Sequence, residues 1–152
     1  MVELDDPAAF IDLVGHELGV SDWLTIDQQR VDDFARVTGD DFWIHVDVAR
    51  AQAELPGGRT IVHGLLLLGL VPLLQRQIFR VRRRGVGLNY GSDRVRYTAS
   101  VMTGSRVRLR QSVGAAVRTP VGTRLTTDCT IEVEGLTRPG VVAQFILLLH
   151  DA

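Results

Sequence analysis

The chain has 152 residues, of which 45% are hydrophobic and 23% charged, a composition typical of a folded domain and not of a disordered chain. Its formal net charge of -1 gives no reason to expect a nucleic acid or an anionic membrane as a partner, and its single cysteine, Cys129, excludes an intrachain disulfide. We therefore expect one domain over residues 1–152, located in the cytoplasm, with no cofactor and no metal.

Caps and turns divide the first half of the chain into short elements. Pro7 to Val14 predicts a short helix, and residues 23–26 predict a short strand. Asp27 suits a helix N-cap, apolar residues follow it at helical spacing, and Gly39 should end that helix. Residues 47–53 predict another short helix, with an aspartate as its cap.

The most apolar part of the sequence predicts a buried central helix. From Gly64 to about Phe79 the residues are apolar on every side of a helix, which is typical of a helix inside a core. Pro72 removes a backbone donor and should kink it. The stretch is too short to span a bilayer.

The second half of the chain alternates with period two, which predicts strands with one buried face. These strands are expected at residues 86–97 (two strands joined or bent at Gly91), 106–110, 124–134 and 141–149. The last is a nearly continuous apolar run, predicted to be buried on both faces and so covered in part by a second subunit. The result is an α+β fold in which an antiparallel sheet of about five strands wraps a long helix.

The segment from Gly39 to Asp47 contains the first candidate site. Asp40 lies at a bend after a predicted helix, His45 follows five residues later, and Phe42 and Trp43 between them are apolar. A carboxylate and an imidazole beside apolar surface suit general acid and base catalysis. The alternative is structural: Asp40 caps a turn, and His45 is a half-buried imidazole with its hydrogen bonds satisfied.

The second candidate site is His63-Gly64, directly before the central helix. Unpaired backbone N–H groups begin a helix, and a glycine lets a ligand approach them, so a carbonyl oxygen that gains negative charge could be stabilised there. A plain tight turn is the alternative. The basic run at residues 80–84 could meet the phosphates of coenzyme A, although an exposed loop explains it as well. Cys129 is interpreted as a core residue and not a nucleophile.

Taken together, these segments resemble the MaoC-like, (R)-specific enoyl-CoA hydratases. The resemblance lies in residues 34–40, 43–47, Gly58 and 61–64, including the five-residue step from Asp40 to His45. Residues 89–97 look like the strand region of single-domain members, so the likeness extends over nearly the whole chain.

The resemblance implies a hot dog fold, usually dimeric, acting on an acyl-CoA or carrier-bound thioester. Asp40 and His45 would hold one water, which adds to C3 of a trans-2-enoyl thioester while a proton reaches C2, giving the (R)-3-hydroxyacyl product. The Gly64 N–H would receive the thioester oxygen, with His63 beside it. Dehydration is the reverse reaction.

Two departures from the family pattern concern the substrate. Phe42-Trp43 stands where the family usually has Asn-Pro, and Gly69 and Pro72 occupy a region where some members place a serine. Both changes suit a bulky, branched or cyclic acyl group bound against Phe42 and Trp43. The alternatives left open are thioester hydrolysis, a dehydration-linked cyclisation in natural-product assembly, and an acyl-binding subunit without turnover.

Overall fold

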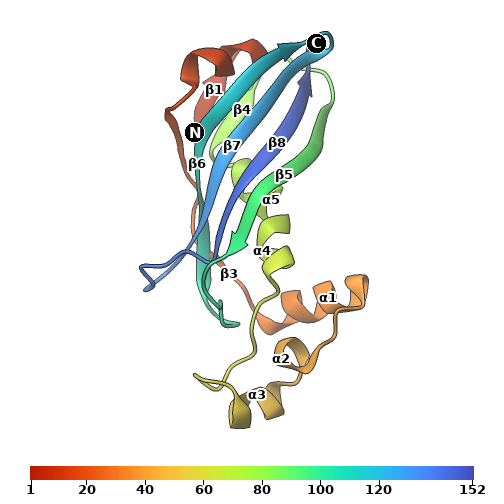
Figure 1. Cartoon of the computed structure of the whole chain (residues 1–152), viewed down its shortest axis with the longest axis vertical. Coiled ribbons are helices and arrows are strands. Elements are labelled where there is room, and N and C mark those ends of the chain that lie inside the picture. Colours follow the sequence, from red (N-terminus) through yellow and green to blue (C-terminus); the bar gives the residue numbers. More distant parts are fainter.

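The computed structural model describes all residues from 1 to 152, and an antiparallel sheet forms most of it (Figure 1). The strands follow the order β2-β6-β7-β8-β5, and β3 pairs with β6 beside β2. Their bounds are β2 Glu17–Val20, β3 Leu24–Thr25, β5 Gly87–Tyr97, β6 Arg106–Thr119, β7 Gly122–Val133 and β8 Val141–His150. A separate parallel pair joins β1 (Val2–Leu4) to β4 (Phe79–Val81).

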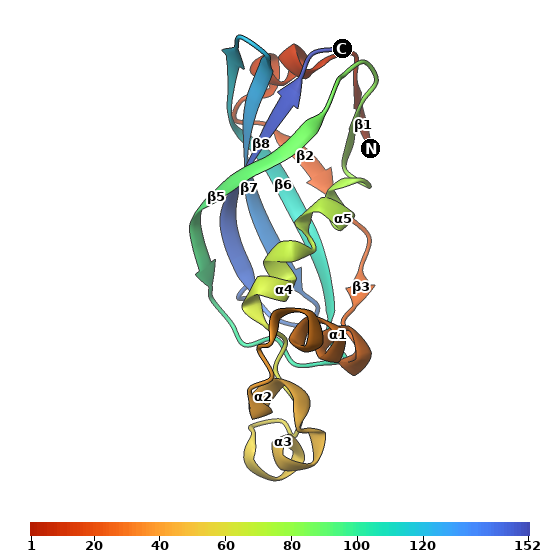
Figure 2. The same cartoon turned by 90° about the vertical axis from the view of Figure 1, so that its right-hand side faces the viewer.

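Six short helical segments connect and cover the sheet. They are the 3-10 helix η1 (Pro7–Leu13) and the α-helices α1 (Gln28–Thr38), α2 (Trp43–Val46), α3 (Val48–Glu54), α4 (Gly64–Gly69) and α5 (Val71–Gln75). Helices α2 and α3 project beyond one end of the sheet (Figures 1 and 2). No helix is both long enough and apolar enough to cross a membrane.

The predicted caps are confirmed. The Asp27 carboxylate accepts the Arg30 N–H at 2.9 Å and begins α1, and the Asp47 carboxylate does the same for the Arg50 N–H of α3. Gly39 ends α1 in the left-handed region, at φ 78°, where glycine carries no steric penalty. These caps fix where the chain turns on either side of Asp40.

The central helix is confirmed but is neither continuous nor buried on all sides. It is divided at Leu70 into α4 and α5, two residues before Pro72, and it ends at Gln75 while Phe79 lies in strand β4. Leu66, Leu67, Leu70, Val71 and Leu74 face the sheet and belong to a core of 26 residues. On the other side, Leu65 is 61% exposed and Leu73 42% exposed, because no element of this chain covers them.

Strand β8 also differs from its prediction. Its side chains alternate between buried and half-buried, so only one face is fully buried within the chain. Residues 87–97 form a single strand, β5, whose register shifts near Gly91 and again between Asp93 and Arg96. Strands β1, β2 and β4 went unpredicted because three or four residues are too few to establish a period.

Candidate active site

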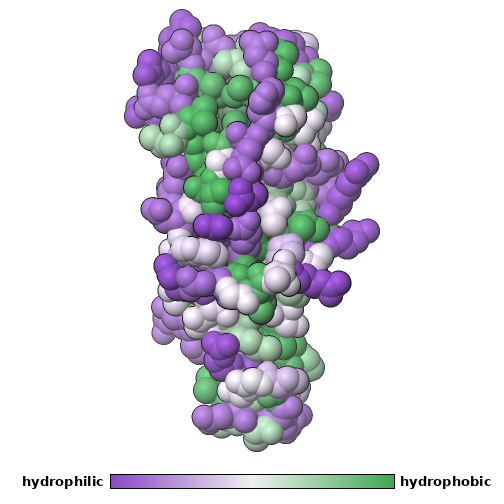
Figure 3. Space-filling model, turned by 90° about the vertical axis from the view of Figure 1, so that its left-hand side faces the viewer, coloured by the Kyte–Doolittle hydropathy of each residue, from purple (hydrophilic) through white to green (hydrophobic).

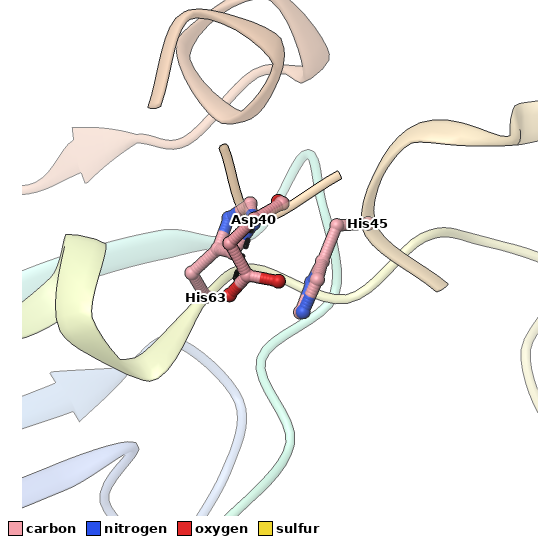
Figure 4. A group of neighbouring side chains, drawn as sticks. All are labelled: Asp40, His45 and His63. Carbon is pink, nitrogen blue, oxygen red and sulfur yellow. Dashed lines mark hydrogen bonds and ion pairs between the residues drawn. The ribbon is translucent and has the colours of Figure 1, made fainter. Parts of the chain in front are cut away.

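Three side chains from separate segments meet beside the N-terminal end of α4. Asp40 lies in the loop after α1, His45 is on α2, and His63 is the N-cap residue of α4. One carboxylate oxygen and one ring nitrogen from each histidine all lie within 4.8 Å of one another (Figure 4). The structure therefore brings together both residues of the predicted pair and adds His63.

The Asp40 carboxylate is more open to solvent than its apolar neighbours in the sequence suggest. The side chain is 53% exposed, and Phe42 is 57% exposed. The expectation that Phe42 and Trp43 hold Asp40 against apolar surface is therefore wrong for the isolated chain. Phe42 is exposed, whereas Trp43 is half-buried and has the Arg50 guanidinium over its ring.

Hydrogen bonds to the backbone orient the His45 ring. Its Nδ1 lies 2.5 Å from the carbonyl oxygen of Ile61. A carbonyl oxygen only accepts, so Nδ1 carries the proton and donates, and Nε2 of the neutral ring is free to accept one. The Gln28 amide donates to the His45 carbonyl at 2.8 Å, and the Ile61 N–H donates to the Ile44 carbonyl at 2.9 Å. Helix α2 is thus fastened on both sides.

The His63 side chain is buried and is bonded to the backbone of Asp40. The side chain is only 2% exposed, and its Nε2 donates to the Asp40 carbonyl oxygen at 2.8 Å. The ring stacks on His45 with 3.7 Å between centroids, and Phe34 lies 4.9 Å away. Its Nδ1 is buried and has no hydrogen-bond partner. Each histidine therefore donates one ring N–H to a carbonyl oxygen and keeps its other ring nitrogen as an acceptor.

A cavity of about 200 Å³ connects His45 with Gly64, the first residue of α4. Tyr97, at the end of β5, lies directly over Gly64: a Cβ atom added there would come within 2.6 Å of the Tyr97 ring. Burial raises the pKa of the Tyr97 hydroxyl above its usual value. Glycine is therefore required at position 64 because an aromatic ring occupies the space of a side chain.

The structure does not bring Phe42 or Trp43 to this cavity. The Phe42 ring lies tilted beside Trp43, with 6.1 Å between ring centroids, and the Arg50 guanidinium lies 3.9 Å from the centre of a Trp43 ring. The substrate contact predicted for these two rings stays a prediction.

Sequence reasoning missed Gln28 and Tyr97 as parts of the site. The sequence placed Gln28 in a predicted helix and Tyr97 in a predicted strand. Nothing in the sequence around either residue indicates that it contacts His45 or Gly64. Cys129 behaves as predicted: it is 3% exposed, and burial raises the pKa of its thiol.

Comparisons with known proteins find relatives over most of the chain. Residues 10–132 match the family described as the MaoC like domain. The chain is 45% identical over 134 residues to 3-hydroxyacyl-thioester dehydratase Z of Mycobacterium tuberculosis, which covers 88% of each protein. It is 41% identical over 139 residues to nodulation protein N of Rhizobium leguminosarum bv. viciae, which covers 90% of this chain and 86% of that protein.

A solved structure agrees with the fold. The (R)-hydratase PhaJ1 from Pseudomonas aeruginosa superposes with a TM-score of 0.77 at 19% identity, over 97% of this chain and 88% of that one. At this identity the likeness concerns the fold alone, and it confirms the hot dog fold expected from the sequence.

Proposed function

The chain belongs to the MaoC-like dehydratase family, and from this premise we propose that it interconverts trans-2-enoyl and (R)-3-hydroxyacyl thioesters by adding or removing water. It is a hydratase/dehydratase, a carbon–oxygen lyase that acts on acyl thioesters. We assign the catalytic roles to Asp40 and His45. The observation that carries this assignment is the closeness of the Asp40 carboxylate to the His45 ring, within 4.8 Å.

That spacing suits one water shared by the two residues. Two hydrogen bonds of about 2.8 Å that meet at a water span about 4.6 Å. The His45 Nδ1–H is engaged with the Ile61 carbonyl, so Nε2 is the nitrogen available to accept a proton. In hydration, the pair removes one proton from the water as its oxygen bonds to C3, and a proton is delivered to C2; dehydration reverses both transfers.

The thioester oxygen gains negative charge during this reaction and needs a donor. We propose the backbone N–H of Gly64, because Gly64 lines the same cavity as His45. The His63 ring is buried and contacts Asp40, so we propose that it positions Asp40 and does not contact the substrate itself.

An assay with crotonyl-CoA and longer enoyl-CoAs tests the proposed function. We expect loss of the conjugated enoyl absorbance, formation of the (R)-3-hydroxyacyl product on chiral analysis, and no release of free thiol. Thiol release would indicate thioester hydrolysis, and binding without any product would indicate an acyl-binding subunit; either result contradicts the proposal.

Gly64→Ala should reduce kcat/KM by about tenfold or more, because the new methyl group displaces either the Tyr97 ring or the Gly64 backbone. Gly69→Ala is the matched control, since position 69 lies on the same helix and has no atom within 4 Å of an added Cβ. Steady-state kinetics and thermal unfolding of both variants check the prediction. Equal activity of the two variants would remove Gly64 from the site.

Phe42→Asn should shift acyl preference toward crotonyl-CoA. If the exposed Phe42 ring packs against the acyl group, the wild-type enzyme gains about 0.8 kcal/mol, or about fourfold in kcat/KM, for each buried methylene. The variant should lose this gain while keeping its stability, because the ring is 57% exposed. Val37→Asn, on exposed α1 surface, is the control. A ratio of kcat/KM values that does not change across the series would separate Phe42 from the substrate.

We further propose a homodimer formed through the side of the molecule that carries β5, α4 and α5. Strand β5 is a long strand at the edge of the sheet, and nearly all of its residues are exposed. Such edges pair readily with another chain. The exposed Leu65 and Leu73 lie on the adjacent helices (Figure 2). The opposite side, in Figure 3, mixes hydrophilic with apolar residues. A partner on the β5 side would cover the uncovered helix face.

Sedimentation should therefore give the mass of a dimer at micromolar concentration. Leu65→Arg should shift the protein toward monomer, because it places a charge in the proposed interface. Leu136→Arg, at a leucine of the β7–β8 loop that is 52% exposed, should leave the dimer intact. A stable wild-type monomer would contradict the proposal.

The chain is also proposed to be one domain located in the cytoplasm. A buried, free thiol at Cys129 is compatible with a reducing compartment. Fractionation of cells that express the protein would test the location.

A further inference from the structure

A second cavity, of about 560 Å³, lies at the opposite end of the central helix from Gly64. It is bordered by the end of α5, by β4 and by the starting residues of β5, so it lies at the edge of the side proposed above for the homodimer. Three arginines line it: Arg76, Arg80 and Arg84. None of its 12 lining residues is acidic, so the cavity carries a local positive charge in a chain whose net charge is -1.

The basic run at residues 80–84 divides into paired and unpaired arginines. Arg82 forms an ion pair with Glu3 at 2.6 Å, and Arg83 forms one with Asp6 at 3.6 Å. In contrast, Arg76, Arg80 and Arg84 make no ion pair with any carboxylate of the chain, although Arg84 donates to the Gly85 carbonyl. The arginines that face the cavity are the ones left without an anion.

Glu3 is the nearby acidic group that responds to this charge. Its pKa is lowered chiefly because Arg82 donates hydrogen bonds to it and attracts it, and to a smaller extent because Arg80 is near. Since Glu3 is already bound by Arg82, it does not neutralise the cavity.

The chemistry of the cavity fits a phosphate group on an amphipathic molecule. A guanidinium presents donors in a planar fork that matches phosphate oxygens, and several together bind a polyanion. Phe79, Val81 and Leu149 also line the cavity and provide apolar surface. A small hydrated anion would gain nothing from that surface, whereas a phosphorylated organic ligand would.

Both cavities are lined in part by strand β5. The cavity at His45 is lined by Tyr97 at the end of β5, and the arginine cavity by Asn89 near its start. The eight residue steps from Asn89 to Tyr97 span on the order of 26 Å at about 3.3 Å per residue. A ligand that reaches both must be long and linear, with its reactive group at one end and its negative charge at the other.

We propose that Arg76, Arg80 and Arg84 bind the phosphates of coenzyme A while its acyl thioester lies at Asp40 and His45. The inference rests on the proposed function for the identity of the ligand. Acyl-CoA has the required form, because a flexible pantetheine arm separates the thioester from the diphosphate and the nucleotide phosphate.

The test compares two double variants of equal charge. Arg80→Gln/Arg84→Gln removes cavity arginines, and Arg83→Gln/Arg106→Gln removes two exposed arginines that pair with Asp6 and Glu134 outside the cavity. Each protein is assayed with crotonyl thioesters of pantetheine, 4′-phosphopantetheine and coenzyme A, and thermal unfolding is measured. Free coenzyme A and pantetheine are also titrated by calorimetry, so the site is examined whether or not turnover occurs.

We expect the cavity variant to raise KM for crotonyl-CoA and Kd for coenzyme A by about tenfold or more, with kcat and the pantetheine thioester little changed. The control variant should change KM for crotonyl-CoA and Kd for coenzyme A by less than about twofold, because exposed ion pairs contribute little. A full effect already present with 4′-phosphopantetheine assigns the site to the phosphate shared with a carrier protein; an effect confined to coenzyme A assigns it to the nucleotide phosphates.

Two results would overturn the proposal: an equal loss with the pantetheine thioester, or an equal loss in both double variants. Failure of the proposed function has a different signature. In that case no thioester is hydrated, while weaker coenzyme A binding in the cavity variant alone still supports the arginine site.

Discussion

Asp40→Asn is expected to lower kcat by about 10²–10⁴-fold, the usual cost of losing a general base. The amide keeps the size of the carboxylate but cannot take a proton from water. The side chain is 53% exposed, and His63 Nε2 makes its hydrogen bond to the Asp40 backbone carbonyl at 2.8 Å, with the carboxylate farther away at 3.9 Å, so the substitution should leave the fold intact. Steady-state kinetics with crotonyl-CoA and thermal unfolding measure the two effects separately.

Asp41→Asn is the matched control for this variant. Asp41 is the adjacent residue, is also exposed, and loses the same charge on substitution. We expect it to keep activity within about twofold of wild type, since a surface charge contributes little. Near-wild-type turnover by Asp40→Asn would refute the assignment, and equal losses in both variants would point to a general effect of charge.

His45→Gln should be similarly damaging, and the double variant Asp40→Asn/His45→Gln should lose much less than the product of the two single losses. The reason is that both residues act on one water, so removing either one already disables the pair. The measurement is a double-mutant cycle on kcat/KM with one enoyl-CoA.

The cycle needs a check on the fold, because His45 also donates to the Ile61 carbonyl. Circular dichroism and the midpoint of thermal unfolding should remain close to wild type in all three variants before their rates are compared. Losses that multiply strictly would mean that Asp40 and His45 act in separate steps, which contradicts a shared water.

Local sequence determined the parts of the fold that depend on short-range hydrogen bonds. Asp27, Gly39 and Asp47 fix helix ends within four residues of themselves, and the period-two pattern identified the long strands β6, β7 and β8. The same signals identified Asp40, His45 and His63-Gly64 as residues to consider, because bends and helix starts are visible in a sequence. Strands of three or four residues left no such signal.

Tertiary structure decided which of these residues meet and what surrounds them. The His63 bond to the Asp40 carbonyl joins residues 23 apart, and Tyr97 reaches Gly64 from a strand that pairs with β8. The ion pair between Arg82 and Glu3 joins residues 79 apart, and it is this pair that distinguishes Arg82 from the unpaired Arg80. Such contacts depend on strand register and on how the helices pack, and those are set by the whole chain. A local pattern specifies which face of an element is apolar, but only the assembled fold decides what covers that face.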